Sequence, residues 1–149
     1  MKKKNIIWIA VVVVIVVWLY SGYNGLVSKD EAVINKWAAV EADYQRRSDL
    51  IPNLVATVKG YAEHESSTLE SVTEARGRAT SVTLNAEDLT EENLRAYQEA
   101  QSEVKSALGR LIAVAESYPD LKANENFRDL QVQLEGTENR IAVSRKEFN

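Results

Sequence analysis

Residues 94–118 read LRAYQEAQSEVKSALGRLIAVAESY, and this stretch decides the fold class. At alternating steps of three and four residues, seven of eight positions carry an apolar side chain, and Gln101 is the exception. This spacing follows the 3.6-residue repeat of an α-helix and places the apolar side chains on one face. Because no two-residue alternation competes with it, the stretch predicts an amphipathic helix.

The same spacing continues on both sides of this stretch, over residues 33–47, 51–82 and 127–148. We call each such row of positions, spaced three and four residues apart, a stripe. Narrow apolar stripes are typical of a helical bundle, because each helix buries one face against its neighbours. We therefore predict an all-α protein with an antiparallel four-helix bundle. The predicted helices occupy residues 26–47, 50–82, 91–118 and 122–149. The later breaks are marked by residues 83–89, by the helix start at Thr90 and by Pro119.

Pro52 leaves two divisions of the chain open. It follows Asp49, which can cap a new helix, and proline is tolerated in a first helical turn. The apolar spacing nevertheless runs across Pro52 without a change of phase. We favour a turn just before Pro52. The alternative is one long, kinked helix from about residue 26 to residue 82.

An uncharged stretch, IIWIAVVVVIVVWLY at residues 6–20, precedes these helices. Extended to Tyr23, it forms a helix of about 27 Å, close to the roughly 30 Å hydrocarbon core of a bilayer. A lone strand in lipid would leave its backbone polar groups unsatisfied, so we predict one transmembrane helix over residues 6–23. The alternative is a cleaved signal peptide, but the residues after the run lack the spaced small residues that cleavage needs.

A basic N-terminal segment, residues 1–5, carries three lysines in front of the predicted span. The positive-inside rule therefore places the N-terminus in the cytoplasm and the helical part outside it. Residues 21–25 are predicted to link the span to the bundle at residues 26–149, and fully extended they reach about 17 Å. In up-down order, the turns near Pro52 and Pro119 share the end of the bundle that is far from the membrane.

The composition argues against several functional classes. The chain has no cysteine, and its single histidine, His64, rules out a metal centre with several histidines from one chain. Neighbouring residues on a helix point about 100° apart, so Glu63, His64 and Glu65 do not converge on one ion. Without the three N-terminal lysines, 15 basic side chains remain against 22 acidic ones, a net charge of −7. We predict no nucleic-acid binding, no cofactor, no metal site and no catalytic activity.

Two charged residues, Arg47 and Glu65, fall on the otherwise apolar stripes. A charge on a buried helix face needs a hydrogen-bonding partner, because an unpaired buried charge is strongly destabilising. We interpret both as members of structural pairs rather than as catalytic groups.

Several stretches of the chain together resemble the LemA family of bacterial membrane-anchored helical proteins. The matching stretches are YNGLV at 23–27, RRSDLIPNLV at 46–55, VKGYA at 58–62, HE at 64–65, AR at 75–76, Leu111, VAESYPDLKA at 114–123 and TENRIA at 137–142. The resemblance implies an anchored four-helix bundle in a bacterial cell membrane, with a turn at Pro52 and no catalytic residues. Family members usually continue past the position of residues 148–149 with a further segment, so the resemblance implies either a natural short form or an incomplete chain.

The resemblance also implies an accessory role, because relatives are linked with membrane proteases and, in magnetosome-forming bacteria, with membrane remodelling. We predict a membrane-anchored scaffold or adaptor that acts on other membrane proteins, one candidate being a membrane protease. The alternative is a self-assembling, membrane-shaping protein that forms homo-oligomers. The two most specific stretches flank the predicted distal turns, where they either cap the helices or form a partner surface. The candidate partner-binding residues are Arg46, Arg47, Asp49, Pro52, Tyr118, Pro119 and Lys122.

Overall fold

The structure is a computed structural model that describes residues 2–149. Met1, the first residue of the predicted basic segment, lies outside the described residues. Within residues 2–149 the chain is helical and contains no strand, which confirms the predicted all-α class. The elements are α1 (Lys2–Lys59), η1 (Glu63–Glu65), α2 (Ser66–Ser81), η2 (Ala86–Asp88), α3 (Glu91–Ala115), α4 (Pro119–Ala123) and α5 (Glu125–Phe148).

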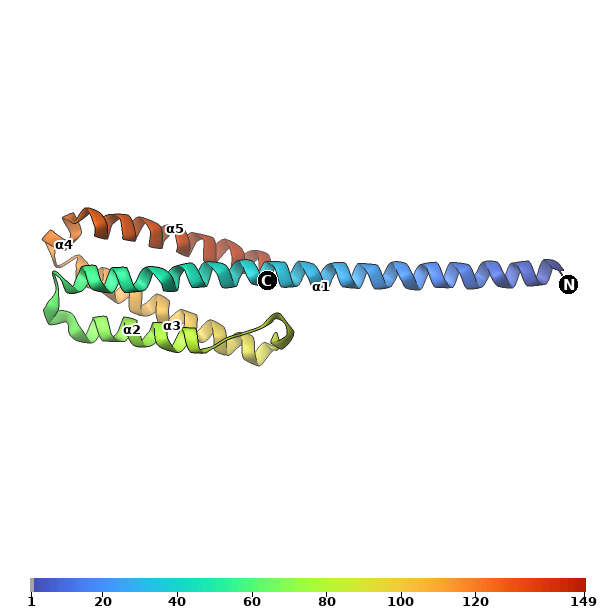
Figure 1. Ribbon diagram of the computed structural model, residues 1–149, viewed down its shortest axis with the longest axis horizontal. Coiled ribbons are helices and arrows are strands. Elements are labelled where there is room, and N and C mark those ends of the chain that lie inside the picture. Colours follow the sequence, from blue (N-terminus) through green and yellow to red (C-terminus); the bar gives the residue numbers. More distant parts are fainter. Residues whose placement is uncertain (1) are drawn as a thin grey trace.

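Figure 1 shows α1 as a single rod, with α2, α3 and α5 beside its C-terminal half and its N-terminal half extending alone. Helix α1 contacts α5 and α2, and α2 contacts α3. The first buried side chain on α1 is Trp37. We call residues 37–148 the helical body. Its far end holds α4 and the turn after α1, and its near end holds the loop of residues 82–90 and the C-terminus.

Helix α1 passes through Pro52 and ends at Lys59, so the predicted turn before Pro52 is wrong. The alternative of one helix to residue 82 is also wrong, because the chain turns between α1 and α2. Proline has no N–H, so the carbonyl of Ser48 lacks its usual donor four residues later. The Nε atom of Arg76 on α2 donates to that carbonyl at 3.0 Å instead. This bond from a neighbouring helix explains why α1 continues across a proline.

The predicted link at residues 21–25 is also helical, so the apolar stretch and the body share one helix. Gly22 and Gly25 have open space around them, and glycine inside a helix costs only about 1 kcal/mol relative to alanine. The apolar part of α1 is long and apolar enough to cross a membrane, with a mean hydropathy of 2.4, and none of it is buried. A core helix of a soluble protein would be mostly buried, so this exposure is consistent with membrane association.

Most apolar positions of the predicted stripes lie in the core of the helical body, although Val33 and Tyr61 are exposed. Of the eight stripe positions in residues 94–118, six are buried, from Tyr97 to Ala115. Of the seven stripe positions in residues 127–148, six are buried, from Phe127 to Ser144. The predicted helix start at Thr90 is confirmed, because its hydroxyl accepts a hydrogen bond from the amide of Asn93 at 3.2 Å. The periodicity therefore identified which faces pack, although it misplaced the first turn.

Candidate functional site

The candidate partner-binding residues lie in two separate places rather than at one end. Arg46, Arg47, Asp49 and Pro52 are in the middle of the part of α1 that belongs to the body. Tyr118, Pro119 and Lys122 are at the far end, in or just before α4. The predicted distal location of the first group is wrong, because the turn follows Lys59 instead of preceding Pro52.

Arg47 is the centre of a buried polar cluster, with only 1% of its surface exposed. Its Nη1 atom donates to Glu138 Oε1 of α5 at 3.0 Å. Its Nη2 atom donates to the carbonyl and to Oε1 of Gln101 on α3, each at 2.8 Å. The guanidinium carbon also lies 5.1 Å from the ring centroid of Tyr44. Arg47 thus connects α1 to both α3 and α5, which confirms its interpretation as a structural pairing residue.

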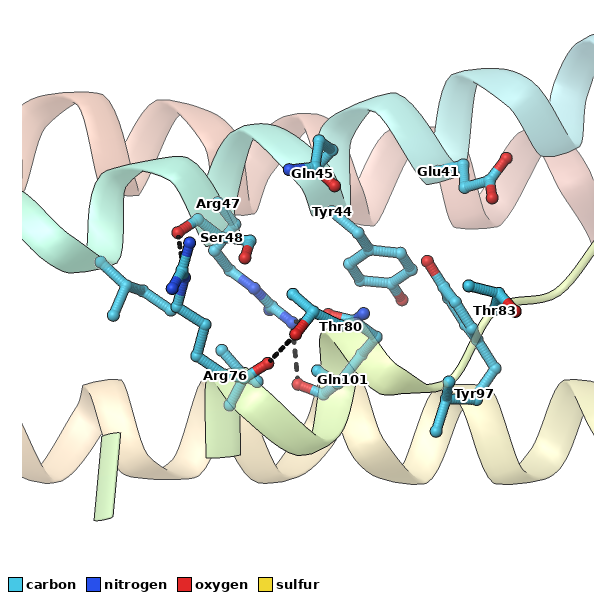
Figure 2. A pocket seen from close by; sticks show the side chains of 14 residues that line it. Glu41, Tyr44, Gln45, Arg47, Ser48, Arg76, Thr80, Thr83, Tyr97 and Gln101 are labelled. Atoms are coloured by element: carbon cyan, nitrogen blue, oxygen red, sulfur yellow. Dashed lines mark hydrogen bonds between the residues drawn. The ribbon is translucent and has the colours of Figure 1, made fainter. Parts of the chain in front are cut away.

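A cleft of about 110 Å³ lies at this cluster, lined by side chains of α1, α2, α3 and the loop after α2. Figure 2 shows the side chains that line it. The Arg47 side chain crosses it toward Gln101, and Arg76 reaches across from α2 to the Ser48 carbonyl. Tyr44 and Tyr97 stand on one side of these bonds. The side chains that meet here hold three helices together.

Both tyrosines of the cleft remain protonated in the ordinary pH range. Burial, followed by the nearby Glu41 carboxylate, raises the pKa of Tyr97 from 10.0 to about 12. Burial also raises the pKa of Tyr44, although the charges of Arg145 and Arg47 oppose this shift. Because both phenols stay neutral, neither tyrosine is activated as a nucleophile. We therefore interpret the two tyrosines and the paired arginine as a packing cluster.

We expect alkaline pH to destabilise the body through Tyr97. Because its folded pKa is raised, this contribution to stability is complete below about pH 10 and is lost as the pH rises through about 12. The loss is on the order of 2–3 kcal/mol. Urea unfolding of the full-length protein at pH 9 to pH 12 should show a shallower pH dependence for Tyr97→Phe than for the wild type. An unchanged slope in Tyr97→Phe would contradict the assignment.

The far end is held together by polar contacts between its two turns. The Tyr118 hydroxyl donates to Glu65 Oε1 at 3.3 Å, which pairs Glu65 as the sequence predicted. Partial burial, followed by the Glu65 carboxylate, raises the pKa of Tyr118, so the hydroxyl keeps the proton that it donates. Asn124 Nδ2 donates to the Tyr61 hydroxyl at 2.8 Å. Lys122 forms an exposed ion pair with Glu116 at 2.8 Å.

Sequence reasoning missed three residues of the buried cluster, Arg76, Gln101 and Glu138. Gln101 was visible as the one polar residue on its stripe, and Glu138 follows a buried stripe position, but neither feature identifies Arg47 as the partner. Arg76 is in a stretch that matches the family, but this match indicates no hydrogen bond, because the need for that bond arises only when Pro52 is inside a helix. In the part of the chain from residue 2 to residue 149, no three His, Asp or Glu side chains are grouped to hold a metal ion.

Comparison with known proteins identifies relatives over nearly the whole chain. The magnetosome protein MamQ of Magnetospirillum gryphiswaldense is 28% identical over 85% of this chain and 53% of its own length. The magnetosome protein MamQ 2 of Paramagnetospirillum magneticum is 27% identical over 93% of this chain and 57% of its own length. Protein LemA of Metamycoplasma hominis is 23% identical, over 89% and 57% respectively.

The chain therefore spans just over half the length of these relatives. The sequence pattern of the LemA family matches residues 36–149, which include the whole helical body. On the strength of this match, the chain belongs to the LemA family.

Proposed function

We propose that this protein is a membrane-anchored helical scaffold or adaptor that acts on other membrane proteins and has no catalytic activity of its own. In this proposal, residues 1–5 are a basic segment, residues 6–23 are the transmembrane anchor, and residues 26–149 contain an antiparallel four-helix bundle, whose packed part is the helical body. The contacts of α1 with α2 and α5, and of α2 with α3, support the bundle. A membrane protease is one candidate partner.

The continuity of α1 is the observation that carries this proposal. One helix of 58 residues includes both the apolar stretch and the first helix of the body. Lys59 is 36 residues after Tyr23, which corresponds to about 54 Å along the helix axis. Because the helix has no break, it fixes the position of the body relative to the apolar stretch. The body would therefore be held at a fixed distance from the bilayer. A fixed distance suits a protein that positions partners.

The lysines at residues 2–4 support a cytoplasmic N-terminus and a body outside the cytoplasm of a bacterial cell. We propose that partners bind the exposed candidates, which are Arg46, Asp49, Pro52, Pro119, Lys122 and the half-buried Tyr118. Arg47 is buried, so in this proposal it maintains the shape of the surface from inside.

The double variant R46E/K122E tests both places, because Arg46 is on α1 and Lys122 is on α4. We expect a folded variant to lose most of its crosslinks to any recurrent membrane partner, because two exposed positive charges become negative. Crosslinking in intact cells followed by mass spectrometry measures this, and circular dichroism checks the fold. The control R140E/K146E reverses two exposed charges elsewhere and should keep the crosslinks. If R46E/K122E is folded and keeps them too, the partner surface lies elsewhere.

Self-assembly is the second candidate function. The apolar side chains of Leu26, Val27, Val33 and Ile34 are exposed on α1 between the predicted span and the body. Exposed apolar patches of this kind mark interaction sites. Crosslinked ladders of the full-length protein with itself, without another partner, would favour self-assembly over the adaptor function.

A further inference from the structure

A groove of about 610 Å³ on the helical body is lined mainly by charged and small side chains. It lies along α3, between α2 and the C-terminal part of α5. Four arginines line it, which are Arg78, Arg95, Arg110 and Arg145, and Glu99 and Glu103 are the only carboxylates among the lining residues. This local excess of positive charge is unusual in a body that is acidic as a whole.

Most of this positive charge is not used within the protein. Arg78 pairs with Glu103 at 3.1 Å, and both side chains are more than half exposed. A surface pair of this kind contributes little, typically below about 1 kcal/mol, and can exchange partners. Arg95, Arg110 and Arg145 form no ion pair within the described residues 2–149. The Arg95 and Arg110 side chains are exposed, so their guanidinium groups are free to bind carboxylates from outside. Arg145 is half-buried, and its buried Nε atom has no hydrogen-bond partner among the described residues. Arginine binds carboxylates well because its guanidinium group allows bidentate geometry.

The length of the groove fits a short peptide segment. Arg95 and Arg110 are 15 residues apart on α3, a distance of about 22 Å along the helix axis. An extended peptide spans this distance with about six or seven residues. The small side chains Ser102, Ser106 and Ala75 lie among the lining residues and leave room for a chain between the arginines.

We propose that this groove binds an acidic segment of another protein, whose carboxylates pair with Arg78, Arg95, Arg110 and Arg145. This step rests in part on the proposed anchor. Because α3 lies alongside α1 (Figure 1), the groove runs in the direction in which the anchor would cross the bilayer and does not lie flat on lipid headgroups. An anionic lipid surface or a long nucleic acid would also face the acidic remainder of the body, whereas a short acidic peptide contacts only the groove.

A labelled peptide of eight glutamates is a suitable probe for this surface. Full-length protein in phosphatidylcholine nanodiscs should bind it, with an affinity that falls as salt is added. Fluorescence anisotropy measures the dissociation constant. We expect R95Q/R110Q to weaken binding about tenfold, since two carboxylate contacts are lost. The control R128Q/R140Q removes the same charge from exposed positions of α5 outside the groove and should weaken binding less than about threefold.

Three results would overturn the proposal, provided that circular dichroism shows folded variants. In the first, the peptide fails to bind the wild type at low salt. In the second, R95Q/R110Q and R128Q/R140Q weaken binding equally. In the third, phosphatidylglycerol added to the nanodiscs displaces the peptide from the wild type, which would make the membrane the occupant. Loss of binding in R95Q/R110Q alone supports the proposal. None of these results depends on the surface tested by R46E/K122E, so the two proposals can fail separately.

Discussion

Arg47→Ala is expected to lower the free energy of unfolding of the helical body by about 3–5 kcal/mol. The substitution removes a buried side chain that bonds Glu138 on α5 and Gln101 on α3. It leaves the Gln101 side chain without this donor and creates a cavity among three helices. Urea unfolding of the full-length protein in a neutral detergent, followed by circular dichroism, measures the loss.

The neighbouring residue provides the matched control. Arg46 is on the same turn of α1 but is exposed, so Arg46→Ala should change the free energy of unfolding by less than about 0.5 kcal/mol. Arg47→Met separates volume from charge, because methionine fills most of the space and removes the cationic group. We expect the free energy of unfolding of Arg47→Met to lie between those of the two alanine variants, since methionine avoids most of the cavity but leaves Glu138 and Gln101 without their donor. Equal stabilities for the Arg46 and Arg47 alanine variants would show that the cluster does not hold the body together.

The stripes of the sequence predicted the buried faces because burial on a helix repeats every 3.6 residues whatever the helix packs against. The same local rule cannot identify partners. Arg47 looked unusual on its stripe, but only the packing of α3 and α5 against α1 brings Gln101 and Glu138 within hydrogen-bonding distance. The prediction of a non-helical link at residues 21–25 was wrong, because the two glycines there disfavour a helix only weakly and no other feature ends it.

Pro52 is the clearest case in which a local rule gave the wrong answer. In isolation the sequence before it favours a helix end, since proline removes an N–H and its ring crowds the preceding turn. In the folded protein Arg76, 24 positions later, donates to the Ser48 carbonyl that proline leaves without a donor. A contact between residues so far apart cannot be read from a stripe, which explains why the first turn of the body was misplaced.

Pro52→Ala is therefore expected to stabilise the body, by roughly 1–3 kcal/mol. Alanine restores the main-chain N–H, which can bond the Ser48 carbonyl inside α1, and removes the steric conflict of the ring. Arg76→Met in the wild-type background should have the opposite effect and cost about 1.5–3 kcal/mol, because it removes a hydrogen bond from a charged donor. Urea unfolding gives both values under the conditions used for Arg47.

The double variant P52A/R76M decides whether the two residues act together. If Arg76 replaces the donor that Pro52 lacks, the Arg76 substitution should cost at least about 1 kcal/mol less in the Pro52→Ala background than in the wild type. Arg78→Met is the control, because Arg78 is two residues further along α2 and forms only an exposed pair with Glu103. Its cost should stay below about 1 kcal/mol in both backgrounds. Additive effects of the Pro52 and Arg76 substitutions would contradict this explanation, because α1 would then tolerate Pro52 without help from α2.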